Sequence, residues 1–185
     1  MLQKKLNLYR DAQKKNEWSD FGTVTSITDS IVLVVGLGDI ALHFARLASA
    51  LGAHVIGLKR SMGPCPEGVH ELHTMDELDE WLPKVDVVAS FVPSTAATHH
   101  MYTKERLMAM KDTAIFLNRG RGDAVASEVL YEALSEGWIA SAGIDVTEME
   151  PLPTDSSLWQ LPNLMMTPHI SGQFHLPETF EHIVD

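Results

Sequence analysis

Residues 31–41 read Ile-Val-Leu-Val-Val-Gly-Leu-Gly-Asp-Ile-Ala and decide the fold of this 185-residue chain. The first five are apolar and mostly β-branched, which predicts a strand that is buried on both faces. The glycines follow that strand directly, and residues 40–51 then form an apolar segment of helical period that stops at Gly52. A strand, a glycine turn and a helix in this order predict the first unit of a dinucleotide-binding fold.

The small residues of this glycine loop have separate physical roles. Gly36 permits the tight turn, Gly38 lets the backbone approach a pyrophosphate, and Ala41 is small enough for the helix to pack closely on the strand. The free N–H groups and the positive end of the helix dipole attract phosphates. We therefore expect Gly36, Gly38, Asp39 and Ile40 to bind a dinucleotide, with a glycine turn that binds no ligand as the alternative.

Strand-like and helix-like segments alternate along the rest of the chain. Strands are expected at residues 54–58, 85–91, 113–117, 139–144 and 164–167, and helices at residues 2–13, 78–82, 103–110 and 127–134. Thr74 and Glu77 form a capping-box pattern before the helix at 78–82, and Ser127 can cap the helix at 127–134. Parallel strands need crossover connections, so six strands predict an α/β Rossmann-type, doubly wound parallel sheet in three layers.

One helix has a clear apolar face. Its members, at helical spacing, are Ile40, Phe44, Leu47, Ala48 and Leu51.

Composition argues against several classes of partner. The formal net charge is -11, whereas nucleic acids and anionic membrane surfaces favour a basic protein. The longest apolar run, residues 31–37, is too short to span a bilayer, and the N-terminus leads into no signal-type hydrophobic core. The single cysteine, Cys65, cannot form an internal disulfide. We expect a cytoplasmic protein that binds a small molecule, without a nucleic-acid or membrane partner.

The histidines give no sign of a metal site. Apart from His169, they show no metal-ligand spacing with cysteine or carboxylates, so no metal is expected. His99 and His100 are neighbours in the sequence and are expected to face different ways.

The residues after the second predicted strand favour NADP over NAD. In the NAD-binding form of this fold, an acidic residue roughly 20 positions after the glycine loop binds the ribose 2′-hydroxyl. This chain instead has Lys59, Arg60 and Ser61 at that place. Two cations and a hydroxyl suit a 2′-phosphate. The alternatives are NAD, or a surface role for these three residues.

Three polar segments follow the last three predicted strands. They are Asn-Arg-Gly-Arg-Gly at 118–122, Asp-Val-Thr-Glu-Met-Glu-Pro at 145–151 and Thr-Pro-His at 167–169. Carboxyl ends of parallel strands meet at one edge of the sheet, where ligands bind in open α/β folds. An arginine, a glutamate or a histidine alone is usually a surface residue, but their convergence on one crevice predicts a catalytic site.

These three segments and the glycine loop, in this order, resemble the D-isomer-specific 2-hydroxyacid dehydrogenases. The stretch at 171–179 is similar to hydroxypyruvate, glyoxylate and phosphoglycerate dehydrogenase-like members. The resemblance implies that Arg121 orients the substrate, Glu150 is the carboxylate partner, and His169 donates or accepts the proton. It also places Asp145 near the nicotinamide carboxamide and Pro93 near the adenosine. We further expect Val92, Asn118 and Gly172 to contact the cofactor.

The chemistry of these groups agrees with the resemblance. Reduction of a 2-keto acid needs a hydride, a proton for the carbonyl oxygen and a cation that holds the substrate carboxylate. His169 suits the proton step, Glu150 would stabilise its imidazolium form, and Arg121 offers a planar fork to a carboxylate. The chain departs from the family pattern at Ala41, at Lys59 and at Arg119, which fills a usually apolar place for no reason visible in the sequence.

The resemblance also implies how the domains are organised. Residues 1–17 are expected to form an N-terminal interdomain helix, residues 18–176 the NAD(P)-binding Rossmann domain, and residues 177–185 the start of a second interdomain helix. The substrate-binding domain is expected to lie outside this chain, and the assembly to be a homodimer. The chain alone should bind NADPH but reduce keto acids negligibly. An alternative function is a nicotinamide-nucleotide-sensing module related to dehydrogenase-like corepressors.

Overall fold

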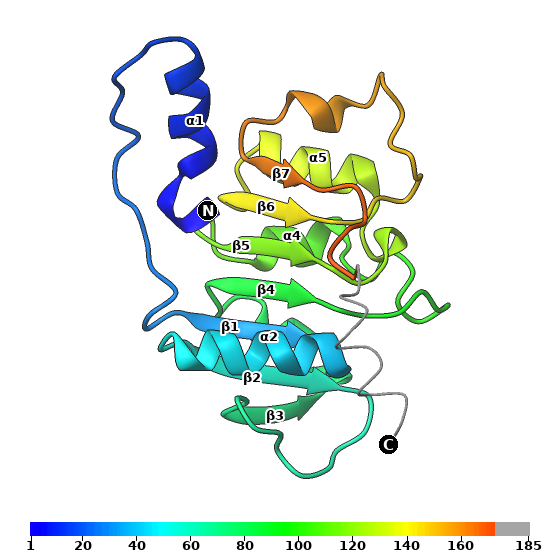
Figure 1. Cartoon of the computed structure of the whole chain (residues 1–185). Helices are drawn as coiled ribbons and strands as arrows, with labels where there is room; N and C mark the ends of the chain where they lie inside the picture. Colours follow the sequence, from blue (N-terminus) through cyan, green and yellow to red (C-terminus); the bar gives the residue numbers. More distant parts are fainter. Residues whose placement is uncertain (173–185) are drawn as a thin grey trace, which may run out of the picture.

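The computed structural model describes residues 1–172, which are built around one seven-stranded sheet (Figure 1). The strands are β1 (Ile31–Val35), β2 (His54–Lys59), β3 (Glu71–Thr74), β4 (Val87–Ser90), β5 (Ile115–Asn118), β6 (Ser141–Ile144) and β7 (Leu164–Met166). Their order is β3-β2-β1-β4-β5-β6-β7, and every neighbouring pair is parallel. The order reverses between β1 and β4, and ligands bind at such a switch point.

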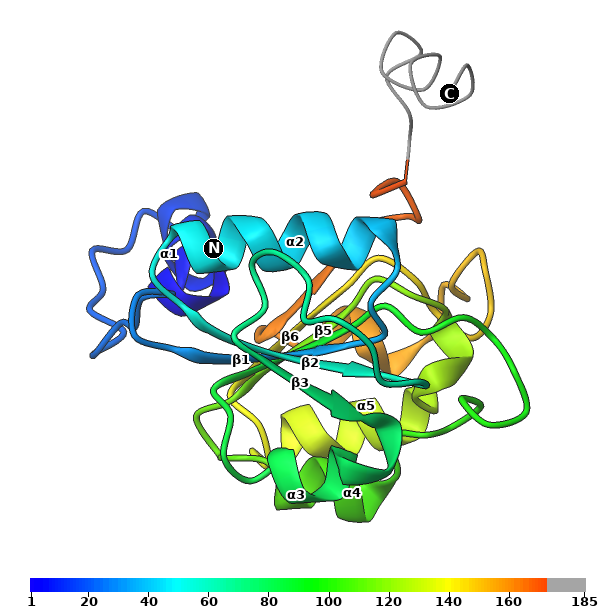
Figure 2. The ribbon, with the colours of Figure 1, turned by 90° about the horizontal axis from the view of Figure 1, so that it is seen from below.

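Helices cover both faces of the sheet (Figure 2). The helices are α1 (Leu6–Lys14), α2 (Asp39–Ala50), α3 (Leu78–Trp81), α4 (Lys104–Ala109) and α5 (Ser127–Ser135), with short 3-10 turns η1 (Leu2–Lys4), η2 (Met75–Glu77), η3 (Gly122–Ala124) and η4 (Ser157–Gln160). α1 and α2 lie on one face, and α3, α4 and α5 lie on the other. The predicted three-layer, doubly wound parallel sheet is therefore confirmed.

Two apolar clusters pack against the two faces of the sheet. In β1, Val32 and Val34 belong to the cluster under α2, whereas Leu33 and Val35 belong to the larger cluster on the opposite side. All four side chains are fully buried. This explains why the strand reads as a continuous apolar run rather than an alternating one.

The prediction of six strands is wrong by one, because β3 pairs with β2 at the edge of the sheet. Its residues, Glu-Leu-His-Thr, form no apolar run, and none of them is fully buried. Edge strands are often short and charged, since one side of the strand has no neighbour to pair with. Hydrophobic periodicity therefore gives no signal for this strand.

The face of α2 that packs on the sheet matches only part of the apolar face identified in the sequence, namely Phe44 and Ala48. The buried residues of α2 are Ala41, Ala45 and Ala48. Small side chains let the helix lie close to the strands, as the third small position of the glycine loop requires. Ile40, Leu47 and Leu51 are not buried, and their exposed fractions are 60%, 55% and 61%.

The N-terminal segment differs from the single helix expected over residues 2–13. Lys5 has a φ of 51°, in the left-handed region, which separates η1 from α1. The Lys5 ammonium donates to the Phe21 carbonyl at 2.5 Å. Leu2 packs against the smaller apolar cluster, so the start of the chain helps to cover the sheet.

The other predicted elements begin and end within two residues of the observed ones. The capping box of Thr74 and Glu77 is formed. Ser127 does not cap α5 as predicted, because it is the first helical residue and its N–H donates to Glu148 Oε2 at 2.7 Å. The carboxylate of Glu148, which is distant in the sequence, thus accepts a hydrogen bond from the first residue of α5. Within residues 1–172, no helix is long and apolar enough to cross a membrane.

Candidate active site at the carboxyl edge

The glycine loop lies at the carboxyl end of β1, at the switch point of the sheet. Gly36 has a φ of 87°, and a Cβ there would lie 3.2 Å from the Phe91 backbone. Gly38 is the N-cap of α2 and supplies no side-chain oxygen to the first N–H groups of that helix. A Cβ on Gly38 would meet nothing within 4 Å. This exposed helix start, which Asp39 and Ile40 continue, fits the phosphates of a dinucleotide.

The basic segment after β2 lies beside this loop. Val35 and Leu58 are register partners, and the Gly36 N–H donates to the Leu58 carbonyl at 2.9 Å. Lys59 therefore follows next to the glycine turn, and Arg60 and Ser61 continue into solvent. The position suits a 2′-phosphate at the end of β2.

The segment after β4 contacts both the glycine loop and the loop that carries Arg121. Val92 is 2% exposed, whereas Pro93 is exposed. The Pro93 carbonyl accepts a hydrogen bond of 2.5 Å from Thr98 Oγ1. A Cβ on Gly120 would overlap the Val92 backbone, so the two segments touch main chain to main chain.

The backbone around Arg121 is held firmly from both sides. Asn118 is fully buried, and its side-chain amide donates to the Arg121 carbonyl at 3.0 Å and accepts from the Gly120 N–H at 3.2 Å. A Cβ on Gly122 would overlap the carbonyl oxygen of Thr147 in the next loop. The Arg121 side chain is exposed, and Nη1 donates to the Gly120 carbonyl at 2.9 Å. The loop is therefore fixed while its guanidinium stays at the surface.

Asp145 fastens the end of β6 to the segment after β7. The residue is 1% exposed, and its carboxylate accepts from the Ile170 N–H at 3.0 Å, the Ser171 N–H at 2.9 Å and the hydroxyls of Thr167 and Ser171. Burial alone would raise the pKa of Asp145. The hydrogen bonds outweigh burial and lower this pKa to about 2. Both carboxylate oxygens are thus engaged within the fold.

Glu150 and His169 form a direct pair beside this network. His169 Nδ1 lies 2.8 Å from Glu150 Oε2, and Glu150 Oε1 accepts from the Thr147 N–H at 3.1 Å. His169 has a φ of 53°, which is uncommon for a residue other than glycine, and its N–H donates to the Asp145 carbonyl at 2.8 Å. The pair borders a pocket of about 580 Å³ whose apolar wall includes Trp159.

The structure brings some of the predicted site residues into contact and not others. Glu150 and His169 are hydrogen-bonded, whereas the side-chain hydrogen bonds of Arg121 within residues 1–172 reach neither of them. The two loops nevertheless meet where Gly122 packs on Thr147. All predicted cofactor residues lie on the carboxyl side of the sheet: Gly36, Gly38, Asp39, Ile40, Lys59, Arg60, Ser61, Val92, Pro93, Asn118, Asp145 and Gly172.

Sequence reasoning missed a second group of histidines and carboxylates at this edge. The rings of His99 and His100 stack with centroids 3.9 Å apart, so the expectation that they face different ways is wrong. The left-handed backbone of His100, with a φ of 47°, turns the two rings to the same side. His100 Nε2 lies 2.6 Å from Glu148 Oε1, and the two residues are too far apart in the sequence for spacing to reveal the pair.

Glu148 links this histidine pair to α5. Burial raises its pKa, but hydrogen bonds from the Ser127 N–H and from His100 outweigh burial and lower it. Within the described range, no three His, Cys, Asp or Glu side chains are grouped so that they could hold a metal ion.

Comparison with known proteins gives this geometry a family context. Residues 1–171 match the family model described as D-isomer specific 2-hydroxyacid dehydrogenase, NAD binding domain. A glyoxylate reductase of Korarchaeum cryptofilum is 39% identical over 145 residues, which are 77% of this chain and 42% of that relative.

Two solved structures superpose on almost the whole chain. A D-isomer specific 2-hydroxyacid dehydrogenase family protein from Aeromonas salmonicida has a TM-score of 0.88 at 36% identity, and the match covers 99% of this chain and 58% of that one. A probable 2-hydroxyacid dehydrogenase from Rhizobium etli, solved with NADP, HEPES and L(+)-tartaric acid, has a TM-score of 0.87 at 30% identity. That match covers 100% of this chain and 59% of the other. The chain thus spans less than two thirds of each of these proteins.

Proposed function

Because this chain belongs to the D-isomer specific 2-hydroxyacid dehydrogenase family, as an NAD(P)-binding domain, we propose that it serves the reduction of a small 2-keto acid. The observation that carries the proposal is the 2.8 Å contact between His169 Nδ1 and Glu150 Oε2 at the ligand-binding edge. The substrate class is supported by the name of the Korarchaeum relative, a glyoxylate reductase. The relatives reported above give no support to the corepressor alternative.

The glycine loop fits the cofactor that this reaction requires. Gly38 leaves open space at the start of α2, and Lys59 and Arg60 lie where a 2′-phosphate would bind. NADPH would supply the hydride when bound. The residues of this chain would hold its phosphates, orient the substrate and transfer the proton.

We assign the proton transfer to His169. Its Nδ1 is engaged by Glu150, so Nε2 remains to face the carbonyl oxygen of a substrate. The Glu150 carboxylate stabilises the imidazolium before transfer, and the proton leaves Nε2 as the carbonyl oxygen becomes a hydroxyl. The Thr147 N–H fixes the carboxylate in this orientation.

Arg121 and Asp145 have different roles in this scheme. The exposed guanidinium of Arg121 would bind the substrate carboxylate, because the surrounding backbone is fixed by Asn118 and the fork geometry suits a carboxylate. Asp145, which we place near the nicotinamide, acts as a positioning residue. Its hydrogen bonds to Ile170 and Ser171 fix the segment that carries His169.

The test of the proton-transfer assignment is His169→Ala in a protein that joins this chain to a substrate-binding domain. We expect kcat for glyoxylate to fall by roughly 10²- to 10⁴-fold while NADPH affinity changes little. His54→Ala is the matched control, since His54 is the first residue of β2 and lies at the amino-terminal end of that strand, away from the carboxyl edge. Near-normal turnover by His169→Ala, beside a normal control, would remove the mechanism.

The preference for NADPH can be tested on the chain itself by titration calorimetry. Lys59→Glu should weaken NADPH binding by at least about tenfold, because only NADPH carries the 2′-phosphate, and should leave NADH binding unchanged or make it tighter, because a carboxylate at this place can accept from the ribose 2′-hydroxyl. Lys15→Glu on the distant N-terminal segment makes the same change in charge and is the control. Higher salt should narrow the difference between the cofactors. Equal affinities for NADPH and NADH at low salt would contradict the preference.

The domain arrangement and the oligomeric state complete the proposal. Residues 1–17 and 177–185 would connect this domain to a substrate-binding domain, although the second segment lies outside the described residues.

A homodimer is supported by the full exposure of Trp18 and the 40% exposure of Val24, which both lie in the segment between α1 and β1. Sedimentation equilibrium should then give twice the chain mass of 20.5 kDa. The cytoplasmic location stays a prediction from composition.

A further inference from the structure

The loop that carries Glu150 is held at both of its ends. At one end, the Asp145 carboxylate binds the segment after β7, and at the other, Glu150 binds His169. Glu148 lies between these ends, two residues before Glu150. The contacts of Glu148 therefore help to determine where the Glu150 carboxylate lies relative to the His169 ring.

Glu148 joins the middle of this loop to two other parts of the fold. Its Oε1 lies 2.6 Å from His100 Nε2, and its Oε2 accepts from the Ser127 N–H, at the start of α5, at 2.7 Å. Burial raises the pKa of Glu148, but these hydrogen bonds outweigh burial and lower it. The carboxylate is therefore charged at neutral pH, and it forms stronger hydrogen bonds than a neutral acceptor would.

His100 is a rigid partner for this carboxylate, because its own backbone and ring are fixed. Its N–H donates to the Asp123 carbonyl at 2.7 Å, and its φ of 47° is uncommon for a residue other than glycine. Its ring stacks on the ring of His99 with centroids 3.9 Å apart. The His100 ring can therefore hold Glu148 in one place with little further loss of side-chain entropy.

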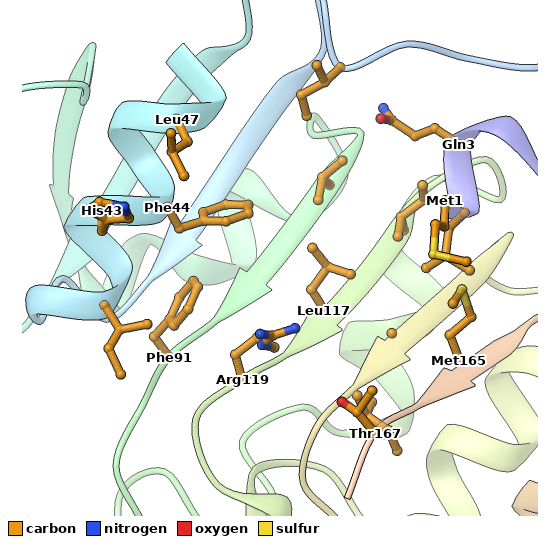
Figure 3. Close-up of a pocket in the computed structure, with 17 residues that line it drawn as sticks. Met1, Gln3, His43, Phe44, Leu47, Phe91, Leu117, Arg119, Met165 and Thr167 are labelled. Carbon is orange, nitrogen blue, oxygen red and sulfur yellow. The ribbon is translucent and has the colours of Figure 1, made fainter. Parts of the chain in front are cut away.

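Two arginines follow β5 at the same edge, and within the described part of the chain neither pairs with Glu148. Arg121 Nη1 donates to a carbonyl of its own loop. Arg119 lines a groove on the α2 side of the sheet, where it lies near Leu117 (Figure 3). Among the basic side chains described at this edge, His100 is therefore the one that contacts Glu148.

Thr147 couples the position of Glu148 to that of Glu150. The Thr147 N–H donates to Glu150 Oε1 at 3.1 Å, and the Thr147 hydroxyl donates to the Met149 carbonyl at 2.7 Å. On its other side, the Thr147 carbonyl lies against Gly122. Because Thr147 and Glu148 share a peptide bond, a shift of Glu148 would displace the N–H that fixes the Glu150 carboxylate.

We propose that His100 is a positioning residue for the proton-transfer pair. Its ring holds Glu148, and Glu148 holds the loop in the place where the Glu150 carboxylate meets Nδ1 of His169. The proposal rests on the proposed function for the catalytic role of this pair, whereas the geometry can be measured without a substrate. His100 acts through Glu148 and the loop, so it needs no contact with the substrate.

The test is the tautomer of the neutral His169 ring in the full 185-residue chain. The nitrogen chemical shifts of the ring report it by NMR at about pH 9, where imidazoles are neutral. A hydrogen bond to the Glu150 carboxylate keeps the proton on Nδ1, because the bond that a ring nitrogen makes determines which nitrogen is protonated. We therefore expect mainly the Nδ1–H form in the wild-type chain.

Two variants of His100 separate its contact with Glu148 from its backbone conformation. His100→Asn removes the contact without straining the backbone, since asparagine tolerates the left-handed region but is too short to reach Glu148. It should raise the ratio of Nε2–H to Nδ1–H at His169 by about twofold or more. His100→Gln should return this ratio to near the wild-type value, because the glutamine amide extends about as far as the histidine Nε2 and can donate to the carboxylate.

His99→Asn is the matched control, because it removes the same ring stack and leaves the contact between His100 and Glu148 in place. Its tautomer ratio should equal that of the wild type. An unchanged ratio in His100→Asn, an equal shift in His99→Asn, or no recovery in His100→Gln would overturn the proposal. Near-normal turnover by His169→Ala would instead remove the catalytic role of the pair and leave the tautomer shifts in place, so the two failures are distinguishable.

Discussion

The two halves of the sheet's carboxyl edge are built in different ways. Around β1 and β2 the site consists of exposed backbone next to open space, since a Cβ on Gly38 would have no atom within 4 Å. Around β5, β6 and β7 it is made by side chains in close contact, and a Cβ on Gly122 would overlap the next loop. At Gly38 in the first half, a substitution should affect ligand binding more than folding. At Gly122 and Asp145 in the second half, where the residue lies against neighbouring segments, it should affect folding first.

Gly122→Ala is the strongest test of this difference. The added methyl group would overlap the Thr147 carbonyl, which belongs to the backbone and cannot rotate away. We expect the free energy of unfolding to fall by about 3 kcal/mol or more, or the chain not to fold. Urea denaturation followed by circular dichroism measures this change. A stable variant would mean that the loops after β5 and β6 move apart easily.

Asp145→Asn tests the hydrogen-bond network of the same half. The pKa of Asp145 is lowered from 3.8 to about 2, so the folded state favours the charged form. This contributes about 2 kcal/mol above pH 4, and the contribution is lost as pH falls through the folded pKa near 2. The stability difference between wild type and variant should therefore shrink between pH 4 and pH 2.

Urea titrations across this pH range provide the measurement for Asp145. Asp112→Asn is the matched control, because Asp112 is an exposed carboxylate outside the site. A difference between wild type and Asp145→Asn that is the same at pH 6 and pH 2.5 would show that the charge of Asp145 contributes nothing.

The contrast between the halves also explains what the sequence could predict. The glycine loop could be recognised because its strand, turn and helix are contiguous in residues 31–51, and local spacing carries the whole pattern. The segments after β5, β6 and β7 could be assigned to one edge by topology alone. Their contacts could not be predicted: the hydrogen bonds of Asp145 reach 26 residues along the chain to Ser171, and Glu148 reaches 48 residues to His100.

α2 shows the same limit within a single helix. Its sequence contains two sets of apolar residues, one mostly of large side chains and one of alanines. Hydrophobicity alone predicts that the large side chains are the buried ones. The small set is buried instead, because the close approach of helix and strand leaves space only for alanine. Ile40 and Leu47 then line an apolar groove of about 690 Å³ together with residues of β4 and β5.

Gly38→Ala should have the smallest effect on stability, and it is the matched partner of Gly122→Ala. Gly38 has a φ of -86°, which alanine adopts freely, and open space surrounds the position. We therefore expect the free energy of unfolding to change by less than about 0.5 kcal/mol. The new methyl group would stand where the backbone must approach the pyrophosphate, so NADPH affinity should fall by about tenfold or more. Urea denaturation and calorimetry on one preparation measure both quantities. If Gly38→Ala destabilised the fold as much as Gly122→Ala, or left NADPH binding unchanged, the two halves of the edge would not differ in the way described.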